Sequence, residues 1–152
     1  MTTLVYRDGV LAADTGASHG AWRMMRGLKK VVRVDYGSKI VLAAAAGDCE
    51  LMAAFLDWQA SGQVDARPVP GNDASLEAIE VTLVRGEAKP TIRLYQYAGS
   101  FEIEDEFVAF GSGSPAALGA LHVGASAVEA VEAAMKVSSN TFGKVASVSF
   151  KE

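Results

Sequence analysis

Short apolar runs alternate with turn residues in the amino-terminal third of the chain. These runs predict strands over residues 3–7, 10–13, 30–34 and 39–46. Asp8-Gly9 lies between the first two runs and is a strong signal for a tight hairpin turn. The last run is apolar almost throughout, which is typical of a strand buried on both faces. Residues 15–28 contain three glycines without a clear period, so we predict that they are mostly loop.

A helical period follows the last of these strands. The apolar residues that recur on one face are Leu51, Met52, Phe55 and Leu56. We therefore predict a helix that starts at Gly47-Asp48, runs through Ala60 and stops before Gly62. Residues 63–74 are rich in proline, glycine, asparagine and aspartate, and are predicted to be a loop.

Strands and helices are grouped in the carboxyl-terminal half. The predicted strands cover residues 79–84, 91–97, 107–110 and 144–150, with a shorter candidate at 101–103. Ser114-Pro115 opens a helix with proline at its first position, and Ser126 is predicted to cap another. Helices do not alternate regularly with strands, which argues against a doubly wound parallel sheet. The order fits an α+β fold in which two antiparallel sheets are sandwiched between helical layers, as one domain over residues 1–152.

Composition excludes several classes of protein. The net charge is −4, so a nucleic-acid binder, which needs a basic face, is set aside. No apolar run reaches the roughly 20 residues of a membrane span, and we expect no secretory signal. Cys49 is the only cysteine, which excludes an internal disulfide and fits the reducing cytoplasm. One cysteine and two distant histidines make a zinc site improbable, and we expect no metal or cofactor.

The second residue is the first candidate for chemistry. If Met1 is removed, Thr2 carries a hydroxyl and a free α-amine on one residue. An α-amine has a pKa of roughly 7.7–8.0, so it can act as the base that activates this hydroxyl. Small residues follow Met1 in many proteins, so the assignment of Thr2 as a nucleophile depends on support from other residues of the chain.

Asp14 and Lys30 are candidates for that support. The hairpin that turns at Asp8-Gly9 returns Asp14, at the end of the second strand, beside the start of the first. Lys30 begins the third strand, and a buried ammonium near a hydroxyl and an amine favours their deprotonated forms. The structural alternatives are a solvated strand-end aspartate and a solvated surface lysine.

Two strand-to-helix junctions offer backbone donors. Gly47 follows Ala46 at the end of a buried strand, where N–H groups can bind the oxyanion of an acyl-transfer intermediate. The segment 111–115 reads Gly-Ser-Gly-Ser-Pro, and lacks both the phosphate-loop lysine and the serine-hydrolase elbow. The alternative is that the glycines at both junctions serve only to form tight or flexible turns.

In combination these features resemble one family. The chain is similar to the proteasome β-subunits and the bacterial HslV peptidase, which are N-terminal nucleophile (Ntn) hydrolases. The resemblance spans nearly the whole chain, and its segments are residues 2–5, 9–14, 29–31, 45–49 and 110–114.

The resemblance implies a four-layer αββα sandwich and roles for named residues. Thr2 is implied to be the nucleophile of a threonine-type peptidase, with Asp14 and Lys30 lowering its pKa. Ser112 is implied to support the α-amine, and Gly47 to bind the oxyanion. Further implied residues are Thr141, which takes the family's hydroxyl position, and Ala45 and Ala46, in the segment of the specificity pocket.

The family also implies partners. We expect a homo-oligomer built as a ring or double ring, a peptide substrate, and an ATP-dependent unfoldase supplied by another chain, because this chain contains no ATPase motif. We expect no nucleic acid and no membrane as partners.

One departure keeps two other functions open. Ser138 stands where the family usually carries an aspartate, and Asn140 replaces that aspartate only if the register moves. Losing this carboxylate removes an acceptor for the amine network. The alternatives are therefore an inactive structural or assembly module, such as a scaffold or virion component, and an amidase acting on a small non-peptide substrate.

Overall fold

The computed structural model describes residues 2–20 and 22–151. Its elements in chain order are β1 (Leu4–Arg7), β2 (Val10–Asp14), β3 (Ala17–His19), β4 (Trp22–Met25), β5 (Val31–Asp35), β6 (Lys39–Gly47), α1 (Cys49–Ala60), β7 (Leu76–Val84), β8 (Thr91–Gln96), β9 (Gly99–Ile103), β10 (Phe107–Phe110), α2 (Ser114–His122), α3 (Ala127–Val137) and β11 (Val145–Ser149). The chain is α+β, as the pattern of apolar residues predicts.

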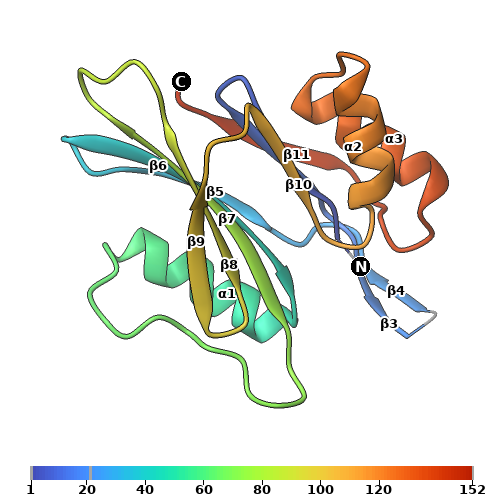
Figure 1. Ribbon diagram of the computed structural model, residues 1–152. Helices are drawn as coiled ribbons and strands as arrows, with labels where there is room; N and C mark the ends of the chain where they lie inside the picture. The colour runs from blue at the N-terminus through green and yellow to red at the C-terminus, as the bar shows by residue number, and fades with distance from the viewer. Residues whose placement is uncertain (1, 21, 152) are drawn as a thin grey trace.

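The strands form antiparallel sheets (Figure 1). One sheet has four strands in the order β10-β1-β2-β11, and another has five in the order β5-β6-β7-β8-β9. The short pair β3-β4 forms a separate two-stranded hairpin. The two ends of the chain thus share one sheet, because β11 pairs with β2 and β10 pairs with β1.

The first hairpin brings the beginning of β1 beside the end of β2. Asp8 and Gly9 both have positive φ values, 51° and 78°, as a tight hairpin turn requires. The register pairs Leu4 with Ala13, so Asp14 follows directly opposite the residues that precede β1. Local turn chemistry therefore positions the candidate carboxylate near the candidate nucleophile.

Alternating side chains divide the core into three clusters. Leu4 and Leu11 of the four-stranded sheet pack with Leu42 and other residues of the five-stranded sheet. On the opposite face, Val5 packs with residues of α2 and α3. The outer face of the five-stranded sheet packs on Phe55 and its neighbours in α1. Figure 1 shows α2 and α3 beside β10 and β11, and α1 beside the other sheet.

The ends of the helices follow their sequence signals. Pro115 occupies the first turn of α2. Ser126 caps α3 in a capping box, in which the Ser126 side chain accepts from the Glu129 N–H and the Glu129 side chain accepts from the Ser126 N–H. These hydrogen bonds lower the pKa of Glu129.

Two regions differ from the sequence prediction by more than two residues. Residues 15–28, predicted to be mostly loop, contain the β3–β4 hairpin. All four residues of β4 are exposed, so no alternation of apolar and polar positions marks it. β7 begins at Leu76 rather than at residue 79, because the ladder with β6 continues to the pair of Gly47 and Leu76.

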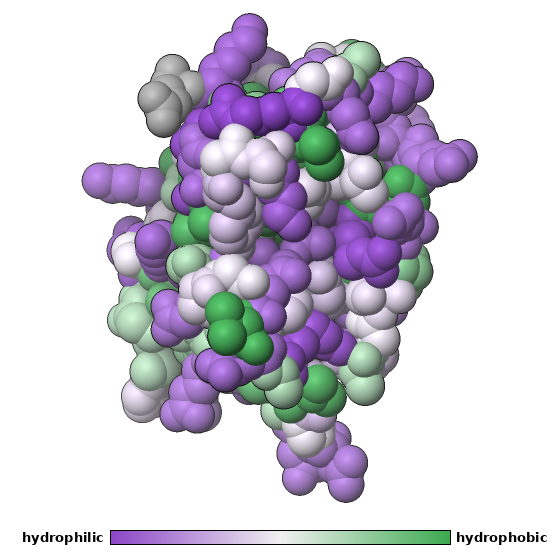
Figure 2. Space-filling view, turned by 90° about the vertical axis from the view of Figure 1, so that its left-hand side faces the viewer, coloured by the Kyte–Doolittle hydropathy of each residue, from purple (hydrophilic) through white to green (hydrophobic). Residues whose placement is uncertain are grey.

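The surface is mixed in character. Figure 2, which views the molecule from the left-hand side of Figure 1, shows hydrophilic residues over most of that face and hydrophobic residues in small separate spots. Within residues 2–20 and 22–151, no helix is both long and apolar enough to cross a membrane.

Candidate active site

Thr2, Asp14 and Lys30 meet in one buried cluster. Lys30 Nζ donates to Thr2 Oγ1 at 2.8 Å and to Asp14 Oδ1 at 3.2 Å. The side chain of Lys30 is 1% exposed, and Asp14 is fully buried. The surface alternatives for both residues are therefore excluded, since each is buried against a group of opposite charge.

Backbone N–H groups hold the Asp14 carboxylate from both sides. Asp14 Oδ1 accepts from the Thr3 N–H at 3.0 Å, and Oδ2 accepts from the Phe142 N–H at 3.2 Å. Hydrogen bonds to both oxygens, together with the Lys30 ammonium, compensate a carboxylate that has no access to water. Asp14 thus connects the start of β1 to the loop before β11.

Burial lowers the pKa of Lys30, while the charge and hydrogen bond of Asp14 and the nearby Cys49 thiol act in the opposite direction. A lysine with a lowered pKa is more often a neutral amine, and a neutral amine can accept the proton of a hydroxyl at hydrogen-bond distance. In its charged form, the same ammonium stabilises an alkoxide on Thr2. Both effects favour a nucleophilic Thr2 oxygen.

The loop before α2 holds the backbone of Thr2. The Thr2 N–H donates to Ser112 Oγ at 3.2 Å. Gly111 has a φ of +97°, and a Cβ at this position would collide with the Thr2 carbonyl oxygen. A Cβ on Gly113 would collide with Thr3 Oγ1 and crowd Thr141 Oγ1. The two glycines therefore allow the loop to approach Thr2 and Thr3 closely.

Thr141 reaches the cluster through the residue that follows Thr2. Its Oγ1 lies 2.8 Å from Thr3 Oγ1, and both side chains are fully buried. Ser138 lies at the end of α3, where its N–H donates to the Ala134 carbonyl at 2.8 Å and its carbonyl accepts from the Thr141 N–H at 3.4 Å. The loop 138–143 contains no acidic residue, so it supplies no carboxylate to the site.

Two cavities adjoin Thr2. The smaller, of about 20 Å³, is lined by Thr2, Gly16, Ala17, Ser18, Leu28, Lys30, Gly47, Cys49 and Met52. The larger, of about 300 Å³, is lined by Thr2, Ala46, Gly47, Ser75, Glu77, Gly111 and Ser112. Gly47 lines both cavities and Ala46 lines the larger, so both residues lie beside Thr2.

Ala45 is not on the wall of either cavity. It is fully buried in the cluster that packs against α1. Successive residues of a strand point to opposite faces, so Ala45 and Ala46 cannot both face Thr2. The assignment of Ala45 to the specificity pocket therefore stays a prediction. Ala45 packs with Met52, which lines the smaller cavity.

The sequence prediction missed Thr3, Gly113, Phe142 and Glu77. Thr3 could have been predicted, because it lies between Thr2 and β1 and is therefore next to the candidate nucleophile. Gly113 follows Ser112 in the same Gly-Ser-Gly motif, so the motif is the signal that marks it. Phe142 acts through its N–H and Glu77 lies on a distant strand, so no local signal marked either of them.

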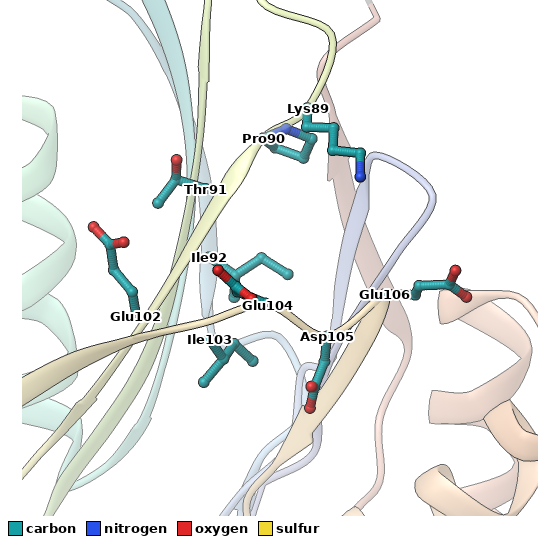
Figure 3. A pocket seen from close by; sticks show the side chains of 9 residues that line it. All are labelled: Lys89, Pro90, Thr91, Ile92, Glu102, Ile103, Glu104, Asp105 and Glu106. Atoms are coloured by element: carbon teal, nitrogen blue, oxygen red, sulfur yellow. The ribbon is translucent and has the colours of Figure 1, made fainter.

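Another cavity, of about 560 Å³, lies where β8 begins and β9 ends. Figure 3 shows its lining between β8, β9 and the segment that leads to β10, with acidic side chains at Glu102, Glu104, Asp105 and Glu106 and one lysine, Lys89. None of the predicted site residues lines this cavity, so the candidate chemistry remains at Thr2.

Several solved structures have a fold similar to that of this chain. BPH from Thiobacillus denitrificans, in complex with epoxomicin, has a TM-score of 0.64 and 22% identity, and the match covers 97% of this chain and 96% of that one. The Anbu complex from Pseudomonas aeruginosa, a helical assembly, has a TM-score of 0.72 and 8% identity, covering 99% and 81%. Anbu from Yersinia bercovieri, described as an ancestral β-subunit, has a TM-score of 0.71 and 10% identity, covering 97% and 80%.

These similarities define the fold. No family model and no curated protein matches the sequence. The structural matches cover nearly all of this chain at low identity, so they show a proteasome-related fold without specifying an activity.

Proposed function

We propose that this protein is a threonine-type peptidase of the proteasome β-subunit and HslV class, with Thr2 as its nucleophile. The observation that carries the proposal is the 2.8 Å hydrogen bond from the buried Lys30 ammonium to Thr2 Oγ1, with Asp14 beside it. The fold shared with BPH, whose structure contains epoxomicin, supports the same conclusion. Packing of helices on the outer faces of the two large sheets supports an αββα sandwich of the Ntn-hydrolase type.

Removal of Met1 is part of the proposal, and Met1 lies outside the described residues. The freed α-amine of Thr2 then takes the Oγ1 proton, through a water, as Oγ1 attacks the carbonyl carbon of a peptide bond. The Gly47 N–H stabilises the oxyanion. The C–N bond breaks, the leaving nitrogen receives the proton, and an ester on Thr2 remains. Water hydrolyses this ester and regenerates the hydroxyl.

The other site residues position these groups. Ser112 holds the nitrogen of Thr2, as its 3.2 Å hydrogen bond indicates. Thr141 acts on Thr2 indirectly, by fixing Thr3. Lys30 and Asp14 keep the nucleophile deprotonated during attack. Ala46 contributes to the wall along which the peptide binds.

Assembly and partners are also proposed. The Anbu matches include a helical assembly, which supports a homo-oligomer of this chain. We propose that the oligomer is a ring or double ring. Degradation of folded proteins by such an assembly requires an ATP-dependent unfoldase on another chain. A single cysteine suits the reducing cytoplasm as the location.

The test combines mass spectrometry with peptide cleavage. The intact mass should correspond to a chain without Met1, and epoxomicin should add its mass to the peptide that begins with Thr2. Thr2→Ala should abolish both the adduct and cleavage. The matched control is Thr91→Ala, an exposed threonine of β8, which should behave as wild type.

Other outcomes identify the alternatives. If the chain lacks Met1 but forms no adduct and cleaves no peptide, it is an inactive structural module. The absence of a carboxylate at position 138 favours this alternative. An adduct without peptide cleavage, combined with hydrolysis of small amides, identifies the amidase.

A further inference from the structure

The two cavities at Thr2 differ greatly in size and in composition. They share Thr2 and Gly47 and are otherwise lined by different segments. The smaller, at about 20 Å³, holds little more than one water molecule, whereas the larger, at about 300 Å³, accommodates an amino-acid side chain. Because the nucleophile and the oxyanion donor line both, the carbonyl under attack lies where the cavities meet. The two sides of the substrate must then occupy different cavities.

The path of the proton indicates which side of the peptide lies in each cavity. In the proposed reaction, the leaving nitrogen receives its proton from the α-amine of Thr2. The N–H of Thr2 donates a hydrogen bond to Ser112 Oγ, and Ser112 lines only the larger of the two cavities. The leaving side of the peptide therefore lies in the larger cavity. The acyl side faces the smaller cavity, beside Lys30.

Glu77 gives the larger cavity its charge. Glu77 is a half-buried residue of β7, opposite Ala46 in the β6–β7 register. It carries the one charged side chain among the seven described residues that line this cavity. Ser75, also on the wall, donates its N–H to Asp48 Oδ2 at 2.7 Å, which places a second carboxylate near the same wall. Lys30, the buried ammonium of the site, is paired with Asp14 and lines the other cavity.

We propose that Glu77 selects a cationic side chain, lysine or arginine, in the residue immediately after the bond that is cleaved. This inference rests on the proposed function and specifies its substrate class. A cation in this cavity gains an ion pair with a carboxylate that is partly shielded from water, while an acidic side chain is repelled.

Three peptides that differ at one position test the proposal. Each carries alanine before the scissile bond, to suit the smaller cavity, and lysine, norleucine or glutamate after it. Norleucine has nearly the length of lysine without its charge. For wild type, kcat/KM should be roughly fivefold higher with lysine than with norleucine, which corresponds to about 1 kcal/mol for a half-exposed ion pair, and lowest with glutamate.

Variants assign the preference to Glu77. Glu77→Gln should reduce the ratio of lysine to norleucine to about 1, and Glu77→Lys should make glutamate the preferred residue. The ratio is measured within each variant, so a change in the amount of folded protein does not affect it. Glu87→Gln, in the exposed turn after β7, is the matched control and should keep the wild-type ratio.

The outcomes separate this inference from the proposed function. Cleavage of all three peptides at similar rates by wild type overturns the inference alone. A lysine preference that Glu77→Gln retains does the same. If wild type forms no epoxomicin adduct and cleaves none of the peptides, the proposed function fails and the inference falls with it. Adduct formation without cleavage of any of the three peptides also counts against the inference.

Discussion

At the scale of single residues, the pair of Lys30 and Asp14 combines a structural role with a chemical one. Both side chains are buried, and each satisfies the charge of the other. Such a pair is costly to break, because removing one partner leaves an uncompensated charge in the interior. The same burial lowers the pKa of Lys30, which prepares it to act on the Thr2 hydroxyl. Stability and the proposed reactivity therefore depend on the same contacts.

Lys30→Met tests both roles together. We expect a loss of about 3–5 kcal/mol in the free energy of unfolding, because Asp14 remains buried without its cation. Among folded molecules, the rate of epoxomicin labelling should fall by roughly 10²- to 10³-fold, as for loss of a group that stabilises charge developing at the reacting oxygen. Urea unfolding and labelling kinetics measure the two effects. Lys29→Met removes an exposed lysine and should change neither, and equal effects of the two substitutions would contradict the assignment.

Gly113→Ala tests the close approach of the loop to Thr3. A Cβ at this position would collide with Thr3 Oγ1, so we expect a loss of about 1–3 kcal/mol and slower labelling of Thr2. The matched control is Gly119→Ala in α2, where nothing lies within 4 Å of the added Cβ. Alanine favours the helix there, and we expect a gain of about 0.5–1 kcal/mol. Thermal unfolding should show the opposite signs, and destabilisation by both would indicate a general intolerance of the segment.

At the scale of elements, the helices are fixed by their caps and by polar contacts to the sheet. α3 begins with a complete capping box at Ser126. α1 is attached to β7 through Gln59, whose Nε2 donates to Glu80 Oε1 at 2.7 Å within a buried layer. Tyr95 of β8 completes this network, with its hydroxyl donating to Glu80 Oε2 at 3.2 Å. These contacts hold the helices that cover the two large sheets.

Ser126→Ala should destabilise the protein by about 1 kcal/mol, because the Glu129 N–H loses its acceptor at the first turn of α3. Urea unfolding at neutral pH measures this loss. Ser139→Ala, an exposed serine beyond the end of α3, is the control and should stay within about 0.5 kcal/mol of wild type. A cap substitution as neutral as this control would mean that α3 is held by packing alone.

The environment of Tyr95 predicts how the free energy of unfolding changes at alkaline pH. Burial and the nearby Glu80 carboxylate raise the pKa of Tyr95 far above its ordinary value of about 10. The unfolded chain therefore loses this proton first, and the stability linked to Tyr95 is complete below pH about 10 and is lost as pH rises above it. Tyr95→Phe lacks this titration, so its free energy of unfolding should fall less steeply between pH 9.5 and 11. Parallel pH curves for the two proteins would contradict the raised pKa.

At the scale of the whole molecule, the site is assembled from both ends of the chain. β1 and β2 bring Thr2 and Asp14, while Ser112 and Thr141 come from segments more than 100 residues later. Since the two large sheets pack through the cluster around Leu4 and Leu42, the relative position of these groups depends on the intact fold. Oligomer formation is a separate property, because the Thr2 side chain points into its own subunit towards Lys30.

Thr2→Ala should therefore lose peptide cleavage while keeping the quaternary structure of wild type. Light scattering coupled to gel filtration should give the same molar mass for both proteins, and well above that of a 15.9 kDa monomer. A wild-type mass equal to one chain would contradict the proposed ring. A monomeric variant beside an oligomeric wild type would instead show that Thr2 contributes to subunit contacts.

The sequence by itself determined the features that depend on local interactions. Turn residues and the period of apolar positions predicted most strands and the three helices of the described residues, and the Asp8-Gly9 turn explains why Asp14 lies near Thr2. The β3–β4 hairpin was not predicted. All four residues of β4 are exposed, so burial imposes no alternation of apolar and polar residues on this strand. The position of Ala45 relative to the site is not marked by local sequence either, because only the packed sheet defines which face of β6 meets Thr2.

Tertiary structure alone decided which distant side chains meet. The burial of Lys30 against Asp14, the hydrogen bond from the Thr2 N–H to Ser112 and the position of Glu77 all follow from how sheets and loops pack. Local sequence carries little information about such contacts, because they are selected by the shape and charge of the whole core rather than by neighbours along the chain.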